Sequence, residues 1–235
     1  MLRAKEIGYE ATEFHFRNGV PYELICKIAE DNDLKVAAMC GHGTLTDGLN
    51  KKENHERIRA ELLESIEIAA RLGIANLICF SGNRNGLEDE TCISIIAEGL
   101  RQVTHEADEA GITLVVELLN SKVDHPGYQC DHTAYGAAVV RQVDSPCVKL
   151  LYDIYHMQIM EGDLIRTITD NIASIGHFHT AGNPGRKDPD ETQEINYPAV
   201  ARAIGESGFE GYVAHEFGSK GDKLEGLEKA YNCFS

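Results

Sequence analysis

The sequence predicts an α/β fold in which parallel strands alternate with helices. Short apolar runs alternate with longer amphipathic runs along the 235 residues. The strand–helix units follow one another without a Pro- or Ser-rich linker. Hydrophobic residues make up 43% of the chain, which is ordinary for a protein with a real core. We therefore expect one domain over residues 1–235.

Seven apolar runs are predicted as strands. Each is rich in Val, Ile, Leu, Phe or Tyr and is bounded by Gly, Asn or Asp. This pattern is typical of strands that are buried on both faces of a parallel sheet. The runs are 8–14, 34–39, 75–82, 112–120, 148–153, 173–181 and 211–217.

The segments between these strands have the spacing of amphipathic helices. The apolar face of segment 54–73 consists of Ile58, Leu62, Ile66 and Ala69. Segment 89–110 repeats the pattern with Ile93, Ile96, Ala97, Leu100 and Val103. Weaker patterns predict helices over 131–143, 161–172, 196–207 and 220–232.

Strand–helix units of this kind form either a doubly wound sheet or a (β/α)₈ barrel. A dinucleotide-binding sheet carries G-x-G-x-x-G between its first strand and helix. Segment GHGTLTDG (41–48) begins with Gly-His-Gly but lacks the third glycine of that motif, and no clear helix follows it. The positions of the polar residues favour the barrel instead.

Four predicted strands end in a side chain that can ligate a metal: Glu117, Asp153, His179 and Glu216. In a barrel the carboxyl ends of all strands meet at one mouth. Three buried carboxylates side by side repel one another, and a divalent cation offsets that cost. The sequence therefore predicts a TIM-type barrel with one divalent metal ion. Oxygen-rich ligation with one imidazole favours Mn²⁺, Mg²⁺ or Co²⁺, and Zn²⁺ is also compatible.

The formal net charge of −16 restricts the partners of the chain. A field of this sign repels nucleic acid and anionic lipid, so we expect neither a nucleic-acid groove nor a membrane-binding surface. No apolar run approaches the roughly 20 residues of a membrane helix, and the N-terminus has no signal-peptide pattern. We expect a cytoplasmic protein with a small-molecule partner.

Several blocks of the sequence occur in order between about residues 35 and 217: VVELLNSKVDHPGYQ, LLYDIYHMQIMEGD, GHFHTAGNPGR, QEINY and GYVAHEF. They resemble hydroxypyruvate isomerases and their ketose 3-epimerase relatives. Those families belong to the xylose-isomerase-like TIM-barrel superfamily. The resemblance implies a metal-dependent isomerase that acts on a sugar or another small hydroxy-carbonyl compound.

The resemblance also implies roles for individual residues. The four strand-end residues match the metal ligands of the family, and Glu117 and Glu216 match its two acid/base glutamates. His156 matches a substrate-binding His, and Arg186 matches an Arg that follows the strand of the third ligand. Two further residues, His42 and Ser81, follow earlier strands and are candidates for the mouth of the barrel.

For an α-hydroxycarbonyl compound these roles combine into one reaction. One Glu removes a proton from the carbon next to the carbonyl, the metal stabilises the resulting enediolate, and the other Glu returns a proton. With hydroxypyruvate the product is 2-hydroxy-3-oxopropanoate, and Arg186 would pair with the carboxylate. Some hydroxypyruvate isomerases have Gln where this chain has His179, whereas the sugar epimerases have His. A ketose 3-epimerase is therefore the alternative.

Two other functions are compatible with the same fold. A sugar- or metal-binding barrel without turnover would keep the ligands. An endonuclease IV-like nuclease uses a trinuclear zinc cluster with many more His and acidic ligands, and the net charge of −16 opposes a DNA groove.

The start of the chain departs from the family pattern. Segment LRAKEIGYEATEF reads as the end of the first helix followed by the second strand, so the first strand is predicted to be missing. A truncated form, a start-site variant or a partner that supplies the strand would each explain this. An unpaired sheet edge favours association, so we expect a homo-oligomer or a covered gap.

Overall fold

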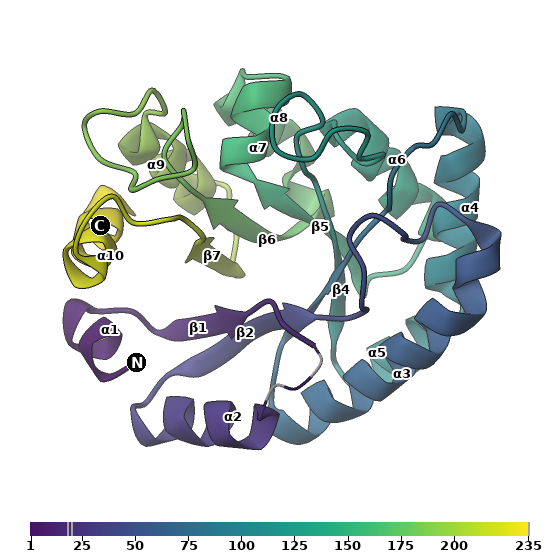
Figure 1. Ribbon diagram of the computed structural model, residues 1–235, viewed down its shortest axis with the longest axis horizontal. Helices are drawn as coiled ribbons and strands as arrows, with labels where there is room; N and C mark the ends of the chain where they lie inside the picture. The colour runs from purple at the N-terminus through teal and green to yellow at the C-terminus, as the bar shows by residue number, and fades with distance from the viewer. Residues whose placement is uncertain (18, 20, 235) are drawn as a thin grey trace.

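Parallel strands alternate with helices and curve into a nearly closed barrel (Figure 1). The computed structural model describes residues 1–17, 19 and 21–234. Within these residues seven strands form one sheet, in which each strand pairs in parallel with the next in chain order. The strands are β1 (Ala11–Phe14), β2 (Lys35–Cys40), β3 (Asn76–Cys79), β4 (Thr113–Glu117), β5 (Val148–Asp153), β6 (Ile175–Thr180) and β7 (Tyr212–His215). The predicted barrel of seven strands is confirmed.

Helices cover the outside of the sheet (Figure 1). They are α1 (Leu2–Ile7), α2 (Tyr22–Asp31), α3 (His55–Leu72), α4 (Asp89–Arg101), α5 (Thr104–Glu109), α6 (Thr133–Val143), α7 (Ile154–Met160), α8 (Leu164–Asn171), α9 (Tyr197–Glu206) and α10 (Lys223–Phe234). Short 3₁₀ turns cover Lys52–Asn54 and Ile172–Ser174. Helix α3 buries the predicted face of Ile58, Leu62, Ile66 and Ala69. Within the described residues no helix has both the length and the apolar character needed to cross a bilayer.

Segment 89–110 forms two helices, not the single helix that we predicted. The backbone of Val103 leaves the helical region, with φ −133° and ψ 3°, so α4 ends and α5 starts again. The last turn of α4 tightens, because the N–H groups of Gln102 and Val103 donate to carbonyls three residues earlier. The break lets both Leu100 and Ala107 reach the core.

The core consists of the faces of β2 to β6 and the helices that pack against them. Large side chains on these strands, such as Leu77, Leu114, Leu150 and Phe178, are fully buried. This explains why the strands read as continuous apolar runs in the sequence.

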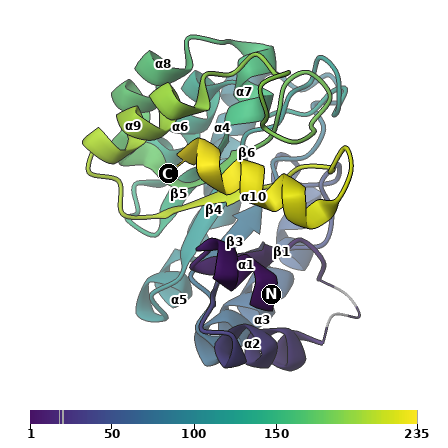
Figure 2. The ribbon, with the colours of Figure 1, turned by 90° about the vertical axis from the view of Figure 1, so that its left-hand side faces the viewer.

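Strands β1 and β7 form a seam, which we define as the gap between these two strands. In the described part of the chain no hydrogen-bonded ladder joins them, and all of their residues are only half-buried. The seam holds a groove of about 610 Å³ between α1, β1, β7 and α10. Helices α1 and α10 lie side by side over its outer face (Figure 2). There the Tyr9 hydroxyl donates a hydrogen bond of 2.9 Å to the Leu227 carbonyl, and the rings of Tyr9 and Tyr231 meet edge to face.

Candidate active site

The register of the sheet brings the four strand-end residues to one mouth of the barrel. Asp153 on β5 lies directly opposite His179 on β6, and Glu117 ends the neighbouring strand β4. Glu216 follows β7, and its N–H donates to the Thr180 carbonyl at 2.9 Å, which extends the ladder by one residue. One ligand atom from each of these four residues lies within 4.8 Å of the others. The predicted cluster is therefore present.

The imidazole of His179 lies at the centre of this cluster. Its Nδ1 lies 3.4 Å from Glu117 Oε1 and 3.1 Å from Glu216 Oε2. Neither ring nitrogen makes a hydrogen bond of good geometry in the described structure, although His179 is fully buried. A buried nitrogen that faces two carboxylates without a directed bond is suited to a cation that would lie among all three groups.

The carboxylates of the cluster also need a positive partner. Asp153 is only 1% exposed, and burial raises its pKa to about 6, although Arg186 opposes the change. Burial alone would lower the pKa of His179, but the carboxylates of Glu13, Glu117 and Glu216 raise it well above its usual value. Three carboxylates and one imidazole at this spacing fit a divalent cation with a preference for oxygen ligands.

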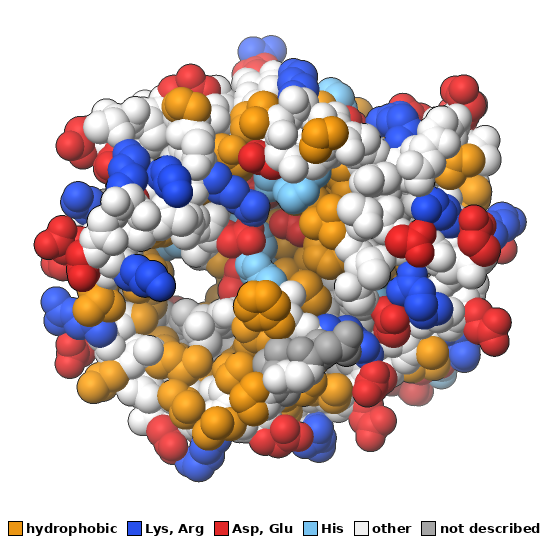
Figure 3. Space-filling model, viewed as in Figure 1, with side chains coloured by type: hydrophobic (Ala, Val, Ile, Leu, Met, Phe, Trp, Pro, Cys, Tyr) orange, Lys and Arg blue, Asp and Glu red, His pale blue; other side chains and the backbone are white. Residues whose placement is uncertain are grey.

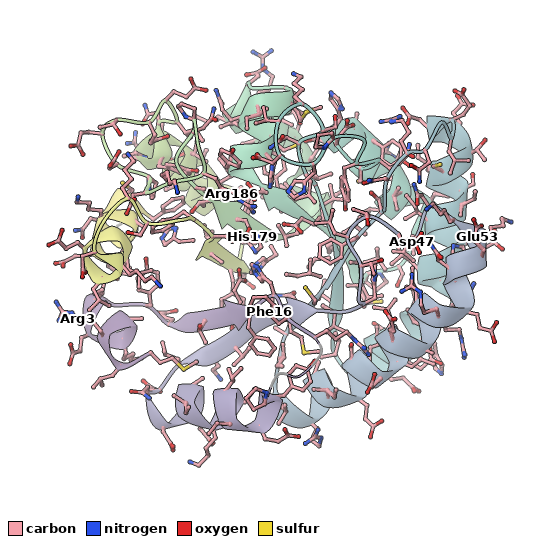
Figure 4. The ribbon with its side chains drawn as sticks, viewed as in Figure 1. Arg3, Phe16, Asp47, Glu53, His179 and Arg186 are labelled. Atoms are coloured by element: carbon pink, nitrogen blue, oxygen red, sulfur yellow. The ribbon has the colours of Figure 1, made fainter. Side chains whose placement is uncertain are left out.

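Arg186 enters the mouth from the loop after β6. It is a non-glycine residue with φ +53°, and its carbonyl accepts a 2.9 Å hydrogen bond from the Gly218 N–H, which ties the loop to the segment after β7. The guanidinium donates to Glu216 Oε2 at 2.5 Å and lies 5.9 Å from the centre of the Tyr155 ring. In Figure 4 the side chains of Arg186 and His179 both point toward the middle of the barrel. Arg186 therefore supplies positive charge to the mouth.

His156 is held beside the cluster but does not line the cavity. The N–H groups of Val123 and Asp124 donate to Asn120 Oδ1, so the amide nitrogen of Asn120 faces the His156 ring. That nitrogen lies 2.5 Å from His156 Nδ1 and donates to it, which places the ring proton on Nε2. Burial lowers the pKa of His156 to about 3 and keeps the ring neutral. The protonated Nε2 lies 3.6 Å from Asp153 Oδ2 and has no hydrogen-bond partner in the described residues.

A cavity of about 270 Å³ opens onto the cluster. Figure 3 shows acidic and His side chains gathered in the hollow at the centre of this face. The apolar wall of the cavity includes Ile78, Phe80 and Leu119, and the predicted mouth residue His42 lines it as well. Ser81 lies outside the lining, because it is fully buried and its hydroxyl bonds to the backbone of Gly82 and Cys130. The volume suits a substrate of a few carbon atoms.

Two residues at the end of β1, Glu13 and His15, belong to the site and were missed in the sequence. Glu13 Oε1 lies 2.9 Å from His179 Nε2 and 3.1 Å from His15 Nε2. His15 Nδ1 lies 3.0 Å from Glu216 Oε1. Burial would lower the pKa of His15, but its contacts with Glu13 and Glu216 raise it to about 10. A charged residue inside the strand run ATEFHF, followed two positions later by His, was the signal that could have identified them.

Comparisons with known proteins agree with the barrel fold. The family model of the xylose isomerase-like TIM barrel matches residues 1–234. Over 163 residues the chain is 33% identical to the hydroxypyruvate isomerase of Escherichia coli, which covers 69% of this chain and 62% of that protein. It is 32% identical over 136 residues to a 2-oxo-tetronate isomerase of Cupriavidus necator, which covers 58% and 52% respectively. The chain thus spans less than two thirds of the length of these relatives.

A solved structure shows a similar architecture. The structure from Brucella melitensis that is described as an AP endonuclease, family 2 superposes with a TM-score of 0.88 at 28% identity. The match covers 96% of this chain and 89% of that protein. Because the family model spans nearly all of the sequence and the sheet has the matching architecture, the chain belongs to the xylose isomerase-like TIM barrel family.

Proposed function

We propose that the protein is a metal-dependent isomerase that converts hydroxypyruvate to 2-hydroxy-3-oxopropanoate. The observation that carries the proposal is the placement of two carboxylates, Glu117 and Glu216, beside the same nitrogen of the buried His179 imidazole at one end of a small cavity. Such a pair can take a proton from one carbon and return one to its neighbour.

The residues that would hold the cation are Glu117, Asp153, His179 and Glu216. A divalent cation supplies Lewis-acid chemistry, because it draws electron density from the carbonyl and the neighbouring hydroxyl oxygen and so stabilises negative charge on them. Mn²⁺, Mg²⁺ and Co²⁺ suit this donor set.

The two glutamates carry the proton transfers. One takes a proton from the hydroxymethyl carbon of hydroxypyruvate, and the C–H electron pair forms the double bond of an enediolate. The other glutamate gives a proton to the former carbonyl carbon, while the hydroxyl proton passes from one oxygen to the other. The result is an aldehyde next to a hydroxyl-bearing carbon, with no net gain or loss of atoms.

Arg186 would bind the carboxylate of the substrate. It lines the cavity and brings positive charge into a chain of net charge −16. The names of both relatives designate keto acids, which agrees with a cationic subsite. Arg186→Ala should raise KM for hydroxypyruvate more than for a neutral ketose. An equal rise for both substrates contradicts this role.

Epimerisation of a ketose at C3 is the alternative, and His179 favours it because the sugar epimerases have His at this position. The same two glutamates would then remove a proton from one face of a carbon and return it to the opposite face. The net charge and the small cavity both oppose cleavage of DNA, so that reaction is not proposed.

Proton NMR in D₂O distinguishes these reactions. The protein is incubated with Mn²⁺, Mg²⁺ or EDTA and with hydroxypyruvate or a panel of ketoses, and spectra are recorded after the metal is removed. Deuterium in 2-hydroxy-3-oxopropanoate supports the isomerase, and exchange at C3 of a ketose supports the epimerase. A barrel that binds these compounds without any metal-dependent exchange would contradict both.

A further inference from the structure

Glu13 on β1 is a carboxylate that reaches across the interior of the barrel. Oε2 accepts a hydrogen bond of 3.0 Å from His177 Nε2. Oε1 accepts a hydrogen bond of 3.1 Å from His15 Nε2 and lies 2.9 Å from His179 Nε2. The side chain is only 11% exposed, and all three partners are imidazoles. A carboxylate in this position can orient several rings at once.

The contact between Glu13 and His179 determines which ring nitrogen of His179 faces the cation site. An ionised carboxylate only accepts hydrogen bonds, so the ring nitrogen that faces Glu13 carries a proton. His179 Nε2 is that nitrogen. Nδ1 is therefore the nitrogen that is directed toward Glu117 and Glu216. Metal-bound imidazoles commonly have their second nitrogen fixed by a carboxylate in this way.

Glu13 also reaches the mouth of the barrel through a second ring, His15. Glu13 Oε1 lies 3.1 Å from His15 Nε2, and the other nitrogen of His15 lies 3.0 Å from Glu216 Oε1. Glu13 thus connects to the mouth through two separate rings.

We propose that Glu13 is a positioning residue that holds His179 with Nδ1 directed at the cation site, and so strengthens metal binding without touching the metal. This inference rests on the proposed function, because it requires that the four strand-end residues bind a divalent cation.

The first test measures Mn²⁺ affinity by electron paramagnetic resonance on the wild type, Glu13→Gln and Glu10→Gln. Glu10 is an exposed carboxylate on the segment that leads into β1, so its variant matches the loss of charge without touching the site. Glu13→Gln should bind Mn²⁺ about 10- to 100-fold more weakly than the wild type. Glu10→Gln should bind within about twofold of it, and circular dichroism checks that each variant is folded.

A double-mutant cycle tests whether Glu13 acts through His179. His179→Gln keeps an oxygen atom as a ligand and removes the ring that contacts Glu13. In the His179→Gln background, Glu13→Gln should change Mn²⁺ affinity by less than about threefold, because the contact between the two residues is already lost. A further loss as large as in the wild type overturns the inference.

The remaining outcomes separate this inference from the proposed function. If the wild type binds no Mn²⁺, both are overturned. If Glu13→Gln binds Mn²⁺ as tightly as the wild type, the positioning role alone is overturned. If the wild type binds two equivalents and Glu13→Gln binds one, Glu13 is a ligand of a second cation with His15 and His179, and the positioning role is again overturned.

Discussion

The two sides of the barrel differ in how firmly they are built. Strands β3 to β6 pair on both edges and are almost entirely buried, whereas β1 and β7 at the seam pair on one edge and are half-buried. The side of the barrel formed by β3 to β6 carries Glu117, Asp153 and His179. Glu216 and His15 extend from the two strands of the seam, and their side chains are 26% and 31% exposed. The site therefore combines buried side chains on fully paired strands with partly exposed side chains that water can reach.

Replacement of the two glutamates should show this difference most strongly. Glu117→Gln and Glu216→Gln should each lower solvent deuterium exchange by about 10³-fold, because each removes one of the two groups that we propose to carry the proton. Glu216→Gln should retain more of the wild-type Mn²⁺ affinity than Glu117→Gln does, because water can reach the position of the Glu216 carboxylate and replace it as a ligand. Exchange rates and Mn²⁺ titrations measure the two effects, and Glu98→Gln, whose carboxylate pairs with Lys52 on the surface, is the control. Equal losses of affinity would contradict the difference between the two sides.

A matched pair of phenylalanines tests packing on the two sides. Phe178 on β6 is fully buried against Tyr152 and Phe209, whereas Phe14 on β1 is half-buried beside Tyr22. Phe178→Ala should lower the free energy of unfolding by about 4 kcal/mol. Phe14→Ala should lower it by about 2 kcal/mol, because the half-buried Phe14 side chain buries less apolar surface on folding than Phe178 does. Urea denaturation measures both, and similar values would show that the seam is as well packed as the rest.

Histidines on the two sides should titrate in opposite directions. Burial lowers the pKa of His42 to about 4, although the carboxylate of Glu61 opposes the change, and the Phe80 N–H donates to the unprotonated Nε2. An unfolded His titrates near 6.5, so below that pH the unfolded chain binds more protons, and the stability contributed by neutral His42 is lost as the pH falls toward 4. Between pH 7 and pH 5 this group should lower the free energy of unfolding by about 2 kcal/mol.

The variant His42→Asn should remove that part of the pH dependence, as measured by urea denaturation in EDTA. His15→Asn is the matched control at the seam. Its pKa is raised to about 10, so its contribution is complete below pH 6.5 and is lost only as the pH rises toward 10. A slope between pH 5 and 7 that is unchanged by His42→Asn would contradict the prediction.

The smallest expected effect concerns the outer face of the seam. Tyr9→Phe removes the hydrogen bond from its hydroxyl to the Leu227 carbonyl and should lower the free energy of unfolding by about 1 kcal/mol. Tyr212→Phe on β7 is the control and should change stability by less than about 0.5 kcal/mol. Thermal melts of both variants measure the difference. An effect of Tyr9→Phe no larger than that of the control would mean that α10 is held by other contacts.

Most of the sheet could be predicted because each strand is an apolar run buried on both faces, as in the run that contains Leu150 and Asp153. The metal-ligating candidates were visible because a charged group at the end of such a run is unusual. Helix α7 was not predicted, since its seven residues are too few to show a helical period. Glu13 and His15 were missed because their partners are on β6 and beyond β7, far away in the sequence.

The environment of Ser81 and His156 also could not be read from the sequence. A residue after a strand either faces the mouth or turns back into the backbone, and only the loop geometry decides between the two. In Ser81 the hydroxyl bonds to neighbouring backbone groups, and in His156 the ring bonds to Asn120, which follows another strand.

The contact between His15 and Glu216 spans the seam, because one residue follows β1 and the other follows β7. The gap between the two strands is thus mechanically coupled to the chemistry of the mouth. A molecule that forced the two strands apart would pull the His15 imidazole away from Glu216, for which we propose a role in proton transfer. The rate of the proposed reaction would then report how wide the barrel is open.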